Sequence, residues 1–233
     1  MIDLGLRSGL PINLDLNSMK IVSTGIKLPR VKVKTIKKIK EVLFNQDVKD
    51  LNPYKMYKGI NLTKDSKIFK KHNVRYDITF VPAGKFGKEY AKTYGHSHLS
   101  EIYEVIKGEA LFLIQNINDR DIRLYDVREG EKLVIPGNYE HNVINPSDEP
   151  LVISNLISAQ SKINYNFIKN NQGMSYYGFI YKNKIKFIQN PNYKLLPKLR
   201  RLRPKLGTKI SKKKPLYQQF ISNPEKFSFL QKA

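Results

Sequence analysis

Three of the four histidines in this chain stand where they could hold a metal ion together. His96 and His98 are two residues apart in GHSHLSEIYEVIKG, so on a strand both side chains point to the same face of the sheet. Glu101 follows after a short turn, and His141 begins a later strand. Three imidazoles and one carboxylate suit Fe(II), Mn(II), Ni(II) or Zn(II) and leave coordination positions open for substrate oxygens. The spacing therefore predicts a divalent metal site.

The fourth histidine, His72, lies in the polar basic stretch KKHNVRY and is interpreted as an ordinary surface or hydrogen-bonded residue. Glu101 alone would be interpreted in the same way, as part of a solvated face. On the strand that follows the turn, Glu101, Tyr103 and Val105 share one face because side chains alternate across a strand. Taken together, the order and spacing of His96, His98, Glu101 and His141 favour metal binding over an interpretation of each residue by itself.

The elements that must position these residues are predicted to be short antiparallel strands. Strand signals follow one another from Val74 onward, in VRYDITFVPAG, EYAKTYGHSH, EIYEVIKG, EALFLIQ, IRLYDV, EKLVIPG, HNVINPSDEP and LVISNLIS. Turns are expected at Gly108 and in the polar loop 116–121. Seven or more such strands joined by Gly, Pro, Asn and Asp indicate an all-β fold, either an antiparallel barrel or a jelly roll.

The two ends of the chain are strongly basic, whereas the middle is not. The formal net charge of +22 divides into +11 for residues 1–75, −5 for 76–158 and +16 for 159–233. We expect an N-terminal extension over 1–50 with a strand and a short basic helix, a central domain over 51–194, and a basic C-terminal arm over 195–233. The apolar residues of PLYQQFISNPEKFSFL have helix-like spacing and are expected to dock back on the domain.

Composition narrows the function classes. The chain has no cysteine, which excludes disulfides, thiolate metal sites and cysteine nucleophiles. No run of 18 apolar residues and no signal-peptide pattern is present, so we expect a cytoplasmic protein that does not enter a membrane. Lysine-rich segments can bind nucleic acid, but here they lack interleaved aromatic residues, and a solvated surface is the favoured interpretation.

The residues around the predicted metal site resemble the two cupin motifs, H-x-H-x(3,4)-E-x(6)-G and G-x(5)-P-x-G-x(2)-H-x(3)-N. Six residues separate Glu101 from Gly108, five separate Gly130 from Pro136, and His141 precedes Asn145 at the family spacing. The resemblance implies a cupin jelly-roll barrel. The turn after His98 is one residue shorter than the motif, which makes Glu104 an alternative ligand, but Glu104 would point to the opposite face of its strand.

A narrower resemblance covers about residues 54–190. PAGKFGKEYAKTYGHSH, EIYEVIKGEALFLIQ and VIPGNYEHNVINPSDEPLVI are similar to the cupin-type glucose-6-phosphate isomerase family of archaea and some bacteria. The resemblance implies an aldose–ketose isomerase that interconverts glucose 6-phosphate and fructose 6-phosphate in glycolysis and gluconeogenesis. It also implies a homodimer with one divalent metal per subunit, with Fe(II) expected first and Mn(II), Ni(II) or Zn(II) as alternatives.

The same resemblance implies a role for particular residues. Metal ligands would be His96, His98, Glu101 and His141. The substrate would meet Thr79, Thr93 and Gly95 at its phosphate and Tyr54, Tyr103 and Tyr165 elsewhere. Glu101 is the candidate base for an enediol route and Tyr103 is the second candidate catalytic residue; a hydride shift is the competing mechanism. Ile163 stands where family members often carry a histidine.

Three other functions use the same residues. A metal-dependent cupin dioxygenase would have the same ligands and an apolar pocket. A non-catalytic sugar-phosphate sensor or nucleic-acid-associated cupin would bind through the pocket or the basic arms. A purely structural metal would have a closed four-ligand site with no open position.

Overall fold

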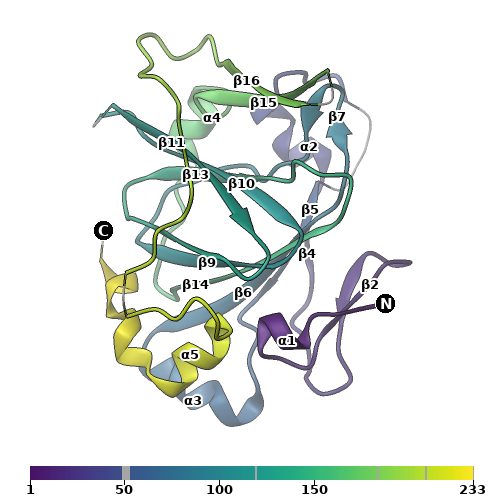
Figure 1. Ribbon diagram of the computed structural model, residues 1–233, viewed down its shortest axis with the longest axis vertical. Helices are drawn as coiled ribbons and strands as arrows, with labels where there is room; N and C mark the ends of the chain where they lie inside the picture. The colour runs from purple at the N-terminus through teal and green to yellow at the C-terminus, as the bar shows by residue number, and fades with distance from the viewer. Residues whose placement is uncertain (49–52, 119, 183, 208, 233) are drawn as a thin grey trace.

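The computed structural model describes residues 1–48, 53–118, 120–182, 184–207 and 209–232. Most of its elements are β-strands (Figure 1). The strands are β1 (Ile2–Asp3), β2 (Asn13–Asp15), β3 (Lys20–Val22), β4 (Lys32–Lys34), β5 (Tyr54–Lys58), β6 (Val74–Val81), β7 (Lys85–Phe86), β8 (Glu89–Tyr90), β9 (Glu101–Lys107), β10 (Glu109–Asn116), β11 (Asp121–Arg128), β12 (Lys132–Ile135), β13 (Glu140–Ile144), β14 (Leu151–Ser158), β15 (Tyr176–Tyr181), β16 (Lys184–Gln189) and β17 (Arg200–Leu202).

The helices are short and lie mostly near the two ends of the chain. The α-helices are α1 (Gly5–Ser8), α2 (Ile36–Ile39), α3 (Ser66–Lys71), α4 (Asn166–Asn170) and α5 (Leu216–Ser222), and the 3₁₀ helices are η1 (Lys40–Val42), η2 (Thr63–Asp65) and η3 (Pro224–Gln231). No helix in the described ranges is long and apolar enough to cross a membrane.

Two sheets form the barrel. One has the strand order β12-β9-β14-β6-β5-β4, and the other has the order β13-β10-β11-β17. A hydrophobic core draws on both sheets, with Val105 and Ile153 from the first and Phe112 and Leu124 from the second. Apart from the parallel pair β11–β17, the strand pairs within these two sheets are antiparallel. The all-β cupin jelly-roll prediction is confirmed.

The predicted turns lie where the strands require them. Gly108 joins β9 to β10 with a φ of +86°, and a Cβ there would lie 2.8 Å from the carbonyl oxygen of Pro150. That left-handed backbone and that close approach both favour glycine. The polar loop 116–121 joins β10 to β11, with residue 119 outside the described residues.

The segment EYAKTYGHSH differs from its prediction as one strand. Only Glu89–Tyr90 belongs to a strand, and the residues beyond it are tied to β13 by isolated bridges that pair Lys92 with Ile144 and His96 with His141. Gly95 interrupts the extended backbone with a φ of +95°, so a continuous ladder cannot form there.

The two ends of the chain pack against the outer face of the six-stranded sheet. Leu10 and Ile12 from the N-terminal segment share a second hydrophobic core with Ile78 of β6 and with Tyr217 and Phe220 of α5. In Figure 1 the purple α1 and the yellow α5 lie on the same side of β6 and β14. The expectation that the C-terminal end docks back on the barrel is confirmed, because α5 and η3 bury apolar side chains against it.

Candidate metal centre and substrate pocket

Strand alternation sets the inner face of the six-stranded sheet. Three rows of residues cross neighbouring strands in register, and each row places its side chains on the barrel side. The rows are Met56–Thr79–Ile153–Val105, then Lys58–Asp77–Asn155–Tyr103–Leu133, then Arg75–Ile157–Glu101–Ile135. Polar and charged groups therefore occupy the middle of a face that is otherwise apolar, which is typical of a binding site rather than a core.

The four predicted ligands meet at one place. One nitrogen or oxygen from each of His96, His98, Glu101 and His141 lies within 4.8 Å of the others. Glu101 comes from β9 and His141 from β13, so the two sheets each supply part of the group. Reciprocal backbone hydrogen bonds of 3.1 and 2.9 Å between His96 and His141 hold the loop carrying His96 to β13.

The charge distribution of the group suits a cation. Nε2 of His98 lies 3.0 Å and Nε2 of His141 lies 2.6 Å from Oε1 of Glu101. Burial alone would raise the pKa of Glu101, but the electrostatic effect of His98 and His141 outweighs it and holds that pKa well below its usual range. The carboxylate is therefore ionised and buried, with its charge facing the imidazole nitrogens.

Two atoms of the group test whether a metal ion fits. Nε2 of His98 and Oε1 of Glu101 are buried and have no hydrogen-bond partner of normal geometry within the part of the chain that the structure describes. Ligand atoms bound about 2.1 Å from a common ion lie about 3.0 to 3.4 Å apart, and the observed separation of this pair is 3.0 Å. The residues therefore fit a divalent metal ion of the kind that binds imidazole nitrogen and carboxylate oxygen together.

Neighbouring side chains orient the ligands. Asn155 of β14 donates a hydrogen bond from Nδ2 to Oε2 of Glu101 at 3.0 Å, which leaves Oε1 facing the histidines. The hydroxyl of Tyr103 lies 3.2 Å from Nε2 of His141. Burial first, and then the charge of Glu101, raise the pKa of Tyr103 well above its usual value, so its hydroxyl keeps its proton.

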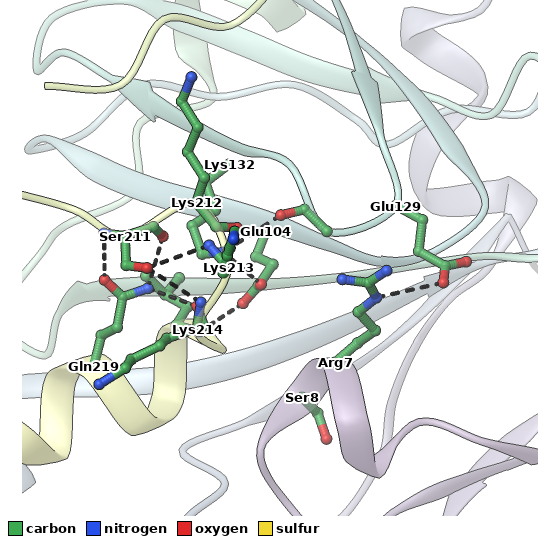
Figure 2. A network of polar contacts seen from close by, with 12 residues as sticks. Arg7, Ser8, Glu104, Glu129, Lys132, Ser211, Lys212, Lys213, Lys214 and Gln219 are labelled. Carbon is green, nitrogen blue, oxygen red and sulfur yellow. Dashed lines mark hydrogen bonds and ion pairs between the residues drawn. The ribbon is translucent and has the colours of Figure 1, made fainter. Parts of the chain in front are cut away.

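The alternative ligand Glu104 points away from this group, as alternation predicts. Its carboxylate lies 2.7 Å from Nζ of Lys132 and accepts a 2.7 Å hydrogen bond from the backbone nitrogen of Leu216. Figure 2 shows Glu104 and Lys132 beside residues 211–214 of the C-terminal segment. Glu104 therefore connects β9 to the C-terminal segment on the outer side of the sheet.

A pocket opens beside the predicted ligands. Its lining includes His96, Glu101 and every predicted substrate residue except Gly95, namely Tyr54, Thr79, Thr93, Tyr103 and Tyr165. Gly95 is next to His96 in the chain, but a Cβ there would meet Met174, Asn142 and Ile168, none of which lines the pocket. Ile163 does line it, so the position where family members carry histidine is apolar at the pocket wall.

Four polar lining residues were missed from the sequence. These residues are Lys58, Arg75, Asp77 and Asn155. Three of them could have been found, because Arg75 and Asp77 alternate with Thr79 along one strand and Lys58 follows Tyr54 at even spacing on another. Nothing in the apolar run LVISNLIS distinguishes Asn155, because its partner Glu101 lies on a different strand.

The fold and the ligand group together define a cupin barrel with a histidine–carboxylate site able to hold a metal ion. The chain belongs to the glucose-6-phosphate isomerase family, because the model of the family described as "Glucose-6-phosphate isomerase (GPI)" matches residues 34–195, more than half of the chain.

Two relatives named "Glucose-6-phosphate isomerase" illustrate the similarity. The one from Thermococcus onnurineus is 28% identical over 126 residues, which are 52% of this chain and 66% of the relative. The one from Pyrococcus furiosus is 26% identical over 129 residues, which are 54% of this chain and 67% of the relative. The match thus spans about two thirds of each relative's length.

Among solved structures, a hazelnut (Corylus avellana) vicilin matches with a TM-score of 0.39 and 15% identity, over 57% of this chain and 32% of that one. A Bacillus subtilis oxalate decarboxylase matches with a TM-score of 0.36 and 21% identity, over 45% of this chain and 25% of that one.

Proposed function

We propose that the protein is a metal-dependent aldose–ketose isomerase that interconverts glucose 6-phosphate and fructose 6-phosphate. The observation that carries the proposal is the convergence of His96, His98, Glu101 and His141 at the edge of a pocket whose lining includes tyrosine and threonine hydroxyls and two cations. The family membership points to the same reaction. The cations Lys58 and Arg75 in the lining favour an anionic substrate over the apolar substrate that a dioxygenase of this fold would bind.

The proposed division of labour follows the geometry. The three histidines and Glu101 would hold the divalent ion, with Fe(II) as the first candidate and Mn(II), Ni(II) and Zn(II) as alternatives. When bound, such an ion supplies Lewis acidity that polarises a carbonyl oxygen and offsets the negative charge of an enediolate. Thr79 and Thr93 would hydrogen-bond the phosphate, and the hydroxyl of Thr93 already accepts a 3.0 Å bond from the backbone of Val143 that fixes its orientation. Gly95 would add its backbone amide, and Tyr54 and Tyr165 would contact the sugar.

Glu101 and Tyr103 are the proposed catalytic residues. Glu101 is ionised and faces the ligand group, but its lowered pKa makes it a weak base. Tyr103 keeps its proton beside His141 and can donate a hydrogen bond to a substrate oxygen. Solvent deuterium distinguishes the two hydrogen-transfer routes, because proton transfer through an enediol introduces label into the product and a hydride shift does not.

The test is a coupled assay of fructose 6-phosphate conversion by the full chain. The protein is stripped of metal and reloaded in turn with Fe(II), Mn(II), Ni(II) and Zn(II). We expect turnover only with added metal, and we expect His141→Ala to remove it. The matched control is His72→Ala, which alters the one histidine outside the group. Absence of turnover with all four metals, in protein shown to bind them, would sink the isomerase proposal.

Further parts of the proposal concern the assembly and location of the protein. We infer a homodimer with one metal per subunit, in the cytoplasm. Light scattering tests whether the protein is a dimer, and a monomer contradicts that inference. Metal analysis against protein concentration tests whether each subunit binds one metal, and a ratio far from one metal per chain contradicts that inference.

A further inference from the structure

The pocket lining contains two cations as well as the carboxylates Asp77 and Glu101. Arg75 and Lys58 are the two cations. Asp77 follows Arg75 by two residues on β6 and lies directly opposite Lys58 of β5. Lys34 adds another cation nearby, with its Nζ 5.0 Å above the ring of the lining residue Tyr165. Exposed lysines are common, but these groups are partly or largely buried, so their charges are poorly compensated by water.

Asp77 orients Arg75 without using all of its guanidinium. Oδ2 of Asp77 accepts a 2.8 Å hydrogen bond from Nε of Arg75, and Oδ1 accepts a 2.9 Å hydrogen bond from the backbone nitrogen of Gly59. Asp77 is therefore occupied on both oxygens. The two terminal nitrogens of Arg75 make no hydrogen bond within the described ranges, and the side chain is 22% exposed. An arginine held by Nε with its remaining donors free is arranged to bind an anion.

Lys58 lies near the negative charge of Asp77 but forms no ion pair with it. Its Nζ makes no ion pair or hydrogen bond with any residue that the structure describes, although Lys58 lies directly opposite Asp77 in the strand register. Burial first, and then the positive charge of Arg75, lower the pKa of Lys58, whereas the charge of Asp77 raises it by less. Two cations thus share one carboxylate that is already occupied, and the balance of charge favours a further anionic group from outside the protein.

We propose that Arg75 and Lys58 form a cationic anchor, positioned by Asp77, that binds a phosphoryl group of the ligand in this pocket. The proposal rests on the proposed function and deepens it, because it makes charge the basis on which the site selects a sugar phosphate over the free sugar. Phosphate is the anion that arginine and lysine together bind most effectively, since arginine offers a planar pair of donors and lysine adds a point charge.

The register also makes the anchor compatible with the metal group. Arg75 and Glu101 belong to one row and are separated by a single strand, β14. Neighbouring strands lie about 4.8 Å apart, so the two backbones are on the order of 10 Å apart across the sheet. One ligand of the size of a hexose phosphate can therefore reach the metal ligands and the anchor together.

The primary experiment measures binding of inorganic phosphate to the metal-loaded full chain by calorimetry at constant ionic strength. Arg75→Gln is expected to weaken binding about ten- to a hundred-fold, the loss that removal of a charge-assisted hydrogen-bonding group produces. Because that variant leaves Asp77 without its cation, the double variant Asp77→Asn/Arg75→Gln is measured beside it. Arg128→Gln, which removes an exposed arginine at the end of β11, is the matched control and is expected to bind as the original chain does.

The two proposals fail in different ways. If the original chain shows no turnover but binds phosphate, and both Arg75 variants lose that binding, the isomerase proposal is refuted and the anchor proposal is supported. The anchor is overturned if the protein turns over substrate but both Arg75 variants bind phosphate as tightly as the original chain. If Thr79→Val weakens phosphate binding in the same experiment, the phosphate is assigned to the threonines. Equal kcat/KM for fructose 6-phosphate and fructose in the original chain also overturns the anchor, because a cationic anchor must discriminate between them.

Discussion

Removing the cation from the buried pair Glu104–Lys132 is expected to destabilise the protein strongly. The two side chains are 2% and 0% exposed, and Lys132 also donates hydrogen bonds to the backbone oxygens of Lys212 and Gly130 (Figure 2). Lys132→Met leaves the carboxylate of Glu104 buried without its counter-charge. Loss of one partner of such a pair costs about 3 to 5 kcal/mol. For a chain of this size, that lowers the melting temperature by about 6 to 20 °C.

The penalty is also expected to depend on pH in a defined direction. Burial raises the pKa of Glu104 in the folded protein, against the opposing charge of Lys132, and removal of Lys132 raises it further. A carboxyl group whose pKa is raised by folding favours the folded state at low pH and loses that contribution as the pH rises through its folded pKa. The free-energy difference between Lys132→Met and the original chain should therefore be larger at pH 8 than at pH 5.

Urea unfolding followed by circular dichroism at both pH values provides the measurement. The control is Lys107→Met, because the pair Lys107–Glu129 has a separation of 3.8 Å and side chains that are 36% and 39% exposed. An exposed pair of this kind contributes about 0 to 1 kcal/mol. Equal effects of the two substitutions, or a Lys132→Met penalty that is the same at pH 5 and pH 8, would refute the reasoning that Glu104 is held ionised by Lys132.

Two further substitutions test the site and the barrel. Asn155→Leu removes the hydrogen bond to Oε2 of Glu101 and is expected to weaken metal binding about ten- to a hundred-fold. Competition with a chelator measures the affinity. An unchanged affinity would mean that Asn155 does not orient Glu101. Gly108→Ala forces a Cβ to 2.8 Å from the oxygen of Pro150 at a φ of +86° and is expected to cost about 1 to 3 kcal/mol in thermal unfolding, whereas Gly207→Ala, with open space around it, is expected to change stability little.

Local pattern was sufficient to predict that the three histidines and Glu101 come together. His96, His98 and Glu101 lie within six residues of one another, so the order of side chains along the chain nearly determines their arrangement in space. Alternation alone also decided between Glu101 and Glu104, and the structure places Glu104 on the opposite face as predicted.

The charged part of the pocket was harder to predict because it depends on pairing between distant strands. Arg75 and Asp77 look like ordinary surface residues within VRYDITFV, since an alternating strand exposes one face to water. In the structure both side chains instead line the pocket. Tyr76 and Ile78 pack against the terminal segments, so the alternate residues face the barrel interior. In the sequence, the signal for this placement is that both residues alternate with the predicted substrate residue Thr79 on one strand.

The shared outer core has a consequence for how the chain folds during synthesis. Leu10 and Ile12 precede Phe220 by about 200 residues, yet all three pack against the same face of the six-stranded sheet. The ribosome adds about 5 to 20 residues per second, so that face must wait on the order of ten seconds or more for its last contacts. Until then the part of that face that Phe220 covers is exposed, and exposed apolar surface of this kind makes a partly folded chain prone to aggregation. The terminal segments thus determine when the barrel is complete.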